Sequence, residues 1–238
     1  SAATPIQAAN TRALSPRYAR GYLAFLSSKG GADGLWTLDN NGSAVELWKG
    51  GDGGVVAPPA ISPDGNRICF SYRKQGHAEL YAINANGTGL TTLAKSIEVQ
   101  SAASWSPDGK WVAVAANQGE GTRVFKVPLD GGPPVRLRDT LSFNPAWSPD
   151  NRFIVYPEQR ASGSFDVKTM TPDGAPVVVP AVASMGSSFP VAFGTPYRFM
   201  PDGKTLITLQ GPAPNQNFFR LDLETGERRQ LTSFDLKS

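Results

Sequence analysis

The chain has 238 residues, of which 40% are hydrophobic and 18% charged, so it can bury a substantial core as a folded domain. Its formal net charge is only +3 and its basic residues are interspersed with acidic ones, which argues against nucleic acid as a partner. No run approaches the roughly 18 apolar residues of a membrane span. A single cysteine, Cys69, excludes an intramolecular disulfide.

Three short apolar runs near the N-terminus predict strands. They begin at Gly21, Leu35 and Val45, with the sequences GYLAFLS, LWTLDNNG and VELW. Short runs of this kind, bounded by Gly, Asn and Asp, are typical of half-buried antiparallel strands.

The segment before these strands is rich in arginine. Arg12, Arg17 and Arg20 make it the densest basic stretch of the chain, and we interpret it as a solvated N-terminal arm. It also contains LSPRYARGY from Leu14, which has Ser-Pro but no Asp-Gly. We interpret this stretch as a weak version of a turn that recurs four times in the rest of the chain.

Four clear copies of that turn follow, and their opening residues are separated by 44, 42 and 52 residues. The copies are AISPDGNR, SWSPDGKW, AWSPDNRF and RFMPDGKT, with turns that open at Ser62, Ser106, Ser148 and Met200. An apolar run follows each turn at constant spacing, and two further strand signals joined by a tight turn come after it. Because another strand signal precedes each turn, every unit predicts a four-stranded antiparallel sheet.

Units of about 40 to 45 residues with four strands are the sequence signature of β-propeller blades. The sequence therefore predicts an all-β fold, with a single propeller domain over residues 1–238 built from five repeat units. The units cover approximately residues 6–50, 55–97, 98–139, 140–180 and 189–234. Two arrangements remain open at this point, a five-bladed ring and a six-bladed ring that lacks its last blade.

The aspartate of each turn is either a ligand in a ring built for chemistry or a structural corner. The residues concerned are Asp64 and Gly65, Asp108 and Gly109, Asp150 and Asn151, and Asp202 and Gly203. In a turn, Pro sets the φ of the second position, Asp accepts hydrogen bonds from nearby amides, and Gly adopts the left-handed conformation. Asn replaces Gly in the third copy, and Asn is the other residue that tolerates this conformation. We therefore expect structural turns.

The whole repeat consists of Ser-Pro-Asp-Gly-Lys, an apolar strand, an aromatic strand and then Asp-Gly-Gly or Asn-Gly-Thr. Over roughly residues 14–238 it resembles the repeat of TolB-type, WD-repeat-like propellers. The N-terminal propellers of prolyl oligopeptidase and dipeptidyl peptidase relatives are similar, and the later copies look most like C-terminal propeller domains of bacterial multidomain proteins. The resemblance implies a β-propeller and, through TolB, a periplasmic or otherwise extracytoplasmic location. It implies no particular activity, because these repeats serve unrelated functions.

The sequence lacks the residue patterns that catalysis or metal binding would need. It has no G-x-S-x-G nucleophile elbow, and His77 is the only histidine, which excludes a site of several histidine ligands. The glycine-rich stretches KGGADG and KGGDGG, from Lys29 and Lys49, lack the order of a phosphate-binding loop, so we interpret them as ordinary loops. We expect a protein that is not an enzyme, with no metal and no cofactor.

The longest repeat interval contains an insertion within PAVASMGSSFPVAFGTPYRF, which begins at Pro180. A segment rich in small and aromatic residues predicts either a binding loop or packing that plugs the ring. Within it, Phe189, Tyr197 and Arg198 are the candidate binding residues.

These features together predict a binding or scaffolding module for a protein or peptide partner, which docks on one face of the ring. We expect it to be part of a bacterial envelope or sensor protein. One alternative is the substrate-gating propeller of an oligopeptidase whose catalytic domain is lacking here. Another is a propeller that binds a small molecule or a glycan.

Overall fold

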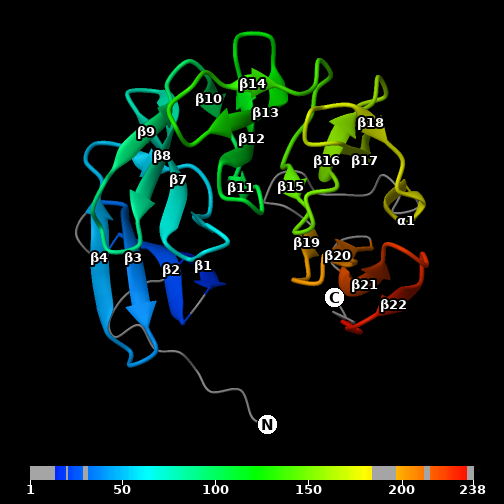
Figure 1. Cartoon of the computed structure of the whole chain (residues 1–238), viewed down its shortest axis with the longest axis horizontal. Coiled ribbons are helices and arrows are strands. Elements are labelled where there is room, and N and C mark those ends of the chain that lie inside the picture. Colours follow the sequence, from blue (N-terminus) through cyan, green and yellow to red (C-terminus); the bar gives the residue numbers. More distant parts are fainter. Residues whose placement is uncertain (1–13, 20, 29–31, 184–196, 212–214, 235–238) are drawn as a thin grey trace.

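The computed structural model describes residues 14–19, 21–28, 32–183, 197–211 and 215–234. They form five antiparallel sheets, the blades, which follow one another around a central space from blade 1 in blue to blade 5 in orange and red (Figure 1). The predicted all-β propeller with five four-stranded blades is therefore confirmed.

Within each blade, the strands run outward from the central space in chain order. Blade 1 contains β1 (Leu14–Ala19), β2 (Tyr22–Ser27), β3 (Gly34–Asp39) and β4 (Ala44–Lys49). Blade 2 contains β5 (Gly54–Val55), β6 (Ala60–Ile61), β7 (Arg67–Lys74), β8 (His77–Asn84) and β9 (Thr91–Ala94). Blade 3 contains β10 (Glu98–Val99), β11 (Ser104–Trp105), β12 (Trp111–Asn117), β13 (Thr122–Pro128) and β14 (Val135–Arg136). Blade 4 contains β15 (Ala146–Trp147), β16 (Ile154–Gln159), β17 (Phe165–Met170) and β18 (Pro176–Val177). Blade 5 contains β19 (Tyr197–Phe199), β20 (Thr205–Gln210), β21 (Asn217–Asp222) and β22 (Arg228–Gln230).

The innermost strand of blades 2 and 3 is split into two short pieces. In blade 2, β5 and β6 pair with successive parts of β7, and the gap between them contains Pro58 and Pro59. Proline has no amide hydrogen and cannot donate to a strand ladder, which explains the interruption. In blade 3, the gap between β10 and β11 contains Ser101, whose hydroxyl accepts a hydrogen bond of 2.8 Å from the Ala115 amide. The split strands therefore remain attached to the sheet.

Helical structure is minor in the part of the chain that the structure describes. The four-residue helix α1 (Pro180–Ala183) follows β18 and packs Ala181 and Val182 into the core between blades 4 and 5. Among the described residues, no helix has the length and apolar character needed to cross a membrane.

The first blade differs from the sequence-based prediction at its innermost strand. The stretch from Leu14 was interpreted as a weak turn, but Leu14–Ala19 is strand β1, paired antiparallel with β2. A bulge interrupts the pairing between Leu14 and Arg17, and Ser15 within it has a φ of 51°. The hairpin turn follows β1 and contains Gly21, with a φ of 90°. The Ser-Pro pair thus forms a bulge in the strand. Arg17 belongs to blade 1 and not to an N-terminal arm, so that interpretation was wrong for Arg17, while Arg12 and Arg20 lie outside the described residues.

Apolar side chains hold consecutive blades together in four clusters. They join blades 1 and 2 around Leu35 and Phe70, blades 2 and 3 around Leu80 and Val114, blades 3 and 4 around Trp147 and Met170, and blades 4 and 5 around Val155 and Leu206. In the three middle blades, the second strand contributes to the clusters on both sides. In β12, for example, five consecutive residues are buried, because each face of the blade is covered by another blade.

Hydrogen bonds near the central space also cross from blade to blade. The Tyr22 hydroxyl donates to the Gly65 carbonyl at 2.9 Å, and the Trp105 indole donates to the Ala60 carbonyl at 2.9 Å. The Trp147 amide donates to the Ser104 hydroxyl at 2.8 Å, and the Tyr197 hydroxyl donates to the Asn144 carbonyl at 2.8 Å. These bonds fix the positions of the innermost strands, so the walls of the central space are built on a rigid frame.

Candidate functional site

The four repeated turns share one backbone conformation. Gly65, Gly109, Asn151 and Gly203 have φ values of 77°, 68°, 61° and 67°, all in the left-handed region. The amide of each of these residues donates to the carbonyl three residues earlier, at 2.9 to 3.0 Å. Each turn is thus closed by its own backbone hydrogen bond, and it uses Gly or Asn where the left-handed conformation requires one of them.

The carboxylates are engaged inside their turns. Asp108 accepts hydrogen bonds from the Ser106 hydroxyl at 2.6 Å and from the Lys110 amide at 3.1 Å, and these two bonds lower the pKa of the carboxyl. Asp64 and Asp150 have equivalent partners. In the fourth turn Met200 takes the place of the serine. Asp202 keeps the bond from the amide two residues on, that of Lys204, and accepts from the Thr205 amide in place of the serine hydroxyl, both at 2.9 Å. Among the described residues, no group of three or more His, Cys, Asp or Glu side chains is arranged to hold a metal ion.

Replacing Asn151 tests the role of the left-handed position. Asn151→Ala should lower the free energy of unfolding by about 2 kcal/mol, because alanine is strained at this φ by about 1 kcal/mol and the bond from the Trp147 indole to Asn151, 2.8 Å long, is lost for about 1 kcal/mol more. Asn151→Gly should cost only about 1 kcal/mol, because it removes the bond without the strain. Urea unfolding of both variants measures the difference, and equal losses would contradict the turn interpretation.

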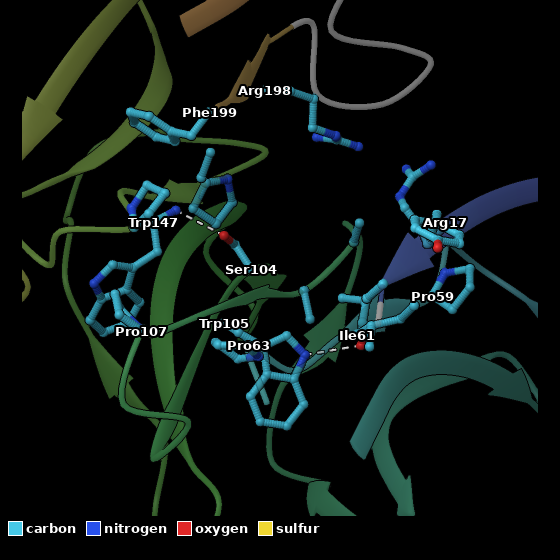
Figure 2. Close-up of a pocket in the computed structure, with 18 residues that line it drawn as sticks. Arg17, Pro59, Ile61, Pro63, Ser104, Trp105, Pro107, Trp147, Arg198 and Phe199 are labelled. Carbon is cyan, nitrogen blue, oxygen red and sulfur yellow. Dashed lines mark hydrogen bonds between the residues drawn. The ribbon is translucent and has the colours of Figure 1, made fainter. Parts of the chain in front are cut away.

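The central cavity is the site that all five blades build. It has a volume of about 490 Å³ and is lined by residues of every innermost strand (Figure 2). Its walls include five prolines: Pro59, Pro63, Pro107, Pro145 and Pro149. The large apolar side chains at the position directly before each of the four turns also line it: Ile61, Trp105, Trp147 and Phe199. The cavity is therefore mainly apolar and has stiff walls.

Two arginines bring positive charge into this apolar cavity. Figure 2 shows Arg17 and Arg198 with their side chains directed toward one another, across the cavity from Trp147 and Phe199. Burial, with a smaller contribution from the charge of Arg198, lowers the pKa of Arg17 to about 10. Burial also lowers the pKa of Arg198, although its side chain stays accessible to solvent. Both remain charged at neutral pH, and no Asp or Glu is found among the described residues that line the cavity.

The structure separates the three candidate binding residues. Arg198 lines the cavity, whereas Tyr197 is 1% exposed and packs into the core between blades 4 and 5. Its hydroxyl donates a hydrogen bond to the Asn144 carbonyl, and burial raises its pKa. The prediction of Tyr197 as a binding residue is therefore corrected, because its side chain packs in the core and does not line the cavity. Phe189 lies outside the described residues. Arg17 and the apolar position before each turn were missed, although the repeat places that position at the same point of every unit.

The side chains with catalytic potential lie away from the cavity. The exposed His77 has its Nε2 atom 3.1 Å from the Lys95 carbonyl oxygen. Cys69 is fully buried, and burial raises the pKa of its thiol. Glu158 is buried and bonded to Thr140, Arg138 and Lys168; burial alone would raise its pKa, but these partners outweigh burial and lower it.

Comparisons with known proteins agree with this architecture. A family model described as TolB beta propeller domain matches residues 3–179. The crystal structure of TolB from Acinetobacter baumannii superposes with a TM-score of 0.75 at 15% identity, covering 92% of this chain and 53% of that one. A putative TolB from Agrobacterium tumefaciens gives a TM-score of 0.70 at 19% identity, covering 93% and 81%. A puromycin-hydrolyzing peptidase from Mycobacterium tuberculosis superposes with a TM-score of 0.68 at 15% identity, covering 94% of this chain and 38% of the peptidase chain. The chain thus spans about half the length of the Acinetobacter TolB, and identities this low show a shared fold alone.

Proposed function

Because the chain belongs to the TolB β-propeller family, we propose that it is a noncatalytic module that binds a protein or peptide segment in its central cavity. The observation that carries the proposal is the cavity of about 490 Å³ to which all five blades contribute. Its size falls within the roughly 300 to 1,000 Å³ of cavities that enclose ligands in proteins. The family resemblance further supports a periplasmic or other extracytoplasmic role in the bacterial envelope.

The chemistry of the walls supports a peptide ligand. The rings of Pro63, Pro107, Pro149 and Phe199 offer accessible apolar surface that is already held in place, so little conformational entropy is lost when a ligand packs against it. Trp105 and Trp147 lie behind this surface and are only 8% and 6% exposed. The side chains with catalytic potential, His77, Cys69 and Glu158, do not line the cavity, so binding without chemistry is the function that this site fits.

The similarity to a puromycin-hydrolyzing peptidase supports a second candidate, a propeller that admits peptides to a hydrolase domain. Both candidates place a peptide in the cavity. They differ in whether the peptide is cleaved, and cleavage would need residues that do not line this cavity.

A variant that fills the cavity tests the proposal. Peptides that bind the protein are first selected from a random library displayed on phage, and their Kd values are then measured by fluorescence anisotropy. Ala102→Trp places a large ring in the cavity and should weaken binding at least about tenfold, which corresponds to 1.4 kcal/mol. Ala161→Trp makes the same change in an exposed hairpin loop and should leave the Kd unchanged.

Two outcomes would contradict the proposal. If selected peptides bind the Ala102→Trp variant as tightly as the original protein, the cavity is not the docking site. If the protein cleaves the peptides and loses that activity on His77→Ala, it is an enzyme and not a noncatalytic module.

A further inference from the structure

One register position of the innermost strands differs sharply between blades. It is the residue that pairs with the third residue of the second strand or, in blade 4, with the second residue. In chain order its occupants, with their partners in parentheses, are Arg17 (Ala24), Ala60 (Cys69), Ser104 (Ala113), Ala146 (Val155) and Arg198 (Ile207). All five line the central cavity, and the three middle blades carry small side chains where the first and last blades carry arginine.

This shared register explains why the two arginine side chains point toward one another. Equivalent positions of equivalent strands project their side chains in the same direction and at the same height, so both arginines extend into the same part of the cavity. Figure 2 shows the result, with the two arginine side chains directed toward one another in the cavity that the small residues also line. Burial, and to a smaller extent the charge of Arg198, lowers the pKa of Arg17, which fits two like charges that face the same space.

Neither arginine has a carboxylate partner among the described residues. Arg17 donates to the Pro16 carbonyl at 3.0 Å, and Arg198 donates to the Tyr197 carbonyl at 3.2 Å. By contrast, Arg138 and Arg160, which lie away from the cavity, each pair with a carboxylate of this chain. Two positive charges beside an apolar wall, with no carboxylate partner among the described residues, form a site for an anion.

We propose that Arg17 and Arg198 together bind one carboxylate group of the peptide segment that enters the cavity. The inference rests on the proposed function and adds the chemistry of the ligand. A guanidinium presents parallel N–H groups that match the two oxygens of a carboxylate, and two of them neutralise its charge in an apolar setting. Side chains next to the carboxylate then pack against the partly exposed Phe199 on the opposite wall.

The rest of the lining favours a peptide over an acidic sugar. The Ser104 hydroxyl already accepts a bond from the Trp147 amide, and the indole N–H groups of Trp105 and Trp147 donate to the Ala60 carbonyl and to Asn151. Apart from the two arginines, the side-chain groups of this lining that can still donate to a sugar hydroxyl are those of Tyr18 and Ser104, whereas apolar peptide side chains need none.

The test uses peptides that are selected from phage-displayed libraries for binding to the full 238-residue chain. Libraries with a free C-terminus and libraries with an internal random stretch are selected in parallel, which distinguishes a C-terminal carboxylate from an Asp or Glu side chain. We expect the selected peptides to share one carboxylate beside apolar residues. Its replacement, by Glu→Gln or Asp→Asn in the peptide or by C-terminal amidation, should raise the Kd about tenfold, the effect of one strong charge-assisted bond.

Variants of the protein complete the test. Arg17→Gln and Arg198→Gln should each raise the Kd about tenfold for the original peptide, but they should have little further effect on the peptide without its carboxylate. Arg229→Gln removes the same charge from the exposed outer strand β22 and should leave the Kd unchanged. Thermal unfolding of each variant confirms that the fold is retained.

The outcomes separate this inference from the proposed function. If peptide binding is lost on Ala102→Trp but is insensitive to the carboxylate and to both arginine variants, the cavity binds peptides and the carboxylate site is wrong. If an oligomer of glucuronic acid binds through the arginines and no selected peptide does, the ligand is an acidic sugar and both proposals fail.

Discussion

Replacing Tyr197 by alanine should lower the free energy of unfolding by about 4 kcal/mol, within the range for removing a large aromatic side chain from a core. The ring is 1% exposed and packs with Val155, Leu206 and Leu221 between blades 4 and 5. The substitution also leaves the Asn144 carbonyl without the hydroxyl donor, 2.8 Å away. Urea denaturation followed by tryptophan fluorescence measures the loss.

A matched control is available in the first blade. Tyr18 also belongs to an innermost strand but is 66% exposed, so Tyr18→Ala should change stability by less than about 0.5 kcal/mol. If Tyr197→Ala instead leaves stability unchanged and abolishes peptide binding, Tyr197 is a ligand contact, as the sequence alone had indicated.

Replacing Gly53 by alanine should lower the free energy of unfolding by about 3 kcal/mol, at the upper end of the cost of forcing extra atoms into a packed region. A Cβ atom at Gly53 would lie 1.9 Å from the Arg73 carbonyl oxygen and 2.7 Å from the Tyr72 ring. The amides of Gly51 and Gly53 both donate to the Tyr72 hydroxyl, at 2.8 and 2.7 Å, so the loop has no room to retreat without breaking these bonds.

The same loop provides the control for this prediction. A Cβ atom at Gly51 would meet nothing within 4 Å, and its φ is not left-handed. Gly51→Ala should therefore change stability by less than about 0.5 kcal/mol. Equal effects of the two variants in urea unfolding would show that the loop moves freely around Tyr72.

The parts of the fold that local chemistry determines were predictable from the sequence. The turn from Ser106 to Trp111 is closed by hydrogen bonds among its own residues, so its pattern recurs wherever the fold needs that corner. The strand at Leu14 was misinterpreted for a related reason. Ser-Pro is part of the turn signal, but it also fits a strand bulge, and pairing with β2 decides between the two.

The candidate site was harder to predict because its environment comes from distant blades. Tyr197 is buried by a partner 53 residues away, and its own neighbours in sequence carry no sign of this. Arg17 and Arg198 lie 181 positions apart in the sequence. They line the same cavity only because the first and last blades both contribute to its wall. Alignment of the repeats by strand register would have placed both arginines in one column beside Ala60, Ser104 and Ala146.

The self-contained turns have a consequence for how such a protein changes in evolution. The hydrogen-bond partners of each turn aspartate lie within three residues of it, so a duplicated or deleted blade carries its own corner and requires no matching change elsewhere. What a copied blade must match is the apolar face of its neighbour, because every cluster draws residues from two consecutive blades. Blade number is therefore limited by the compatibility of adjoining faces and not by the turns that mark each unit.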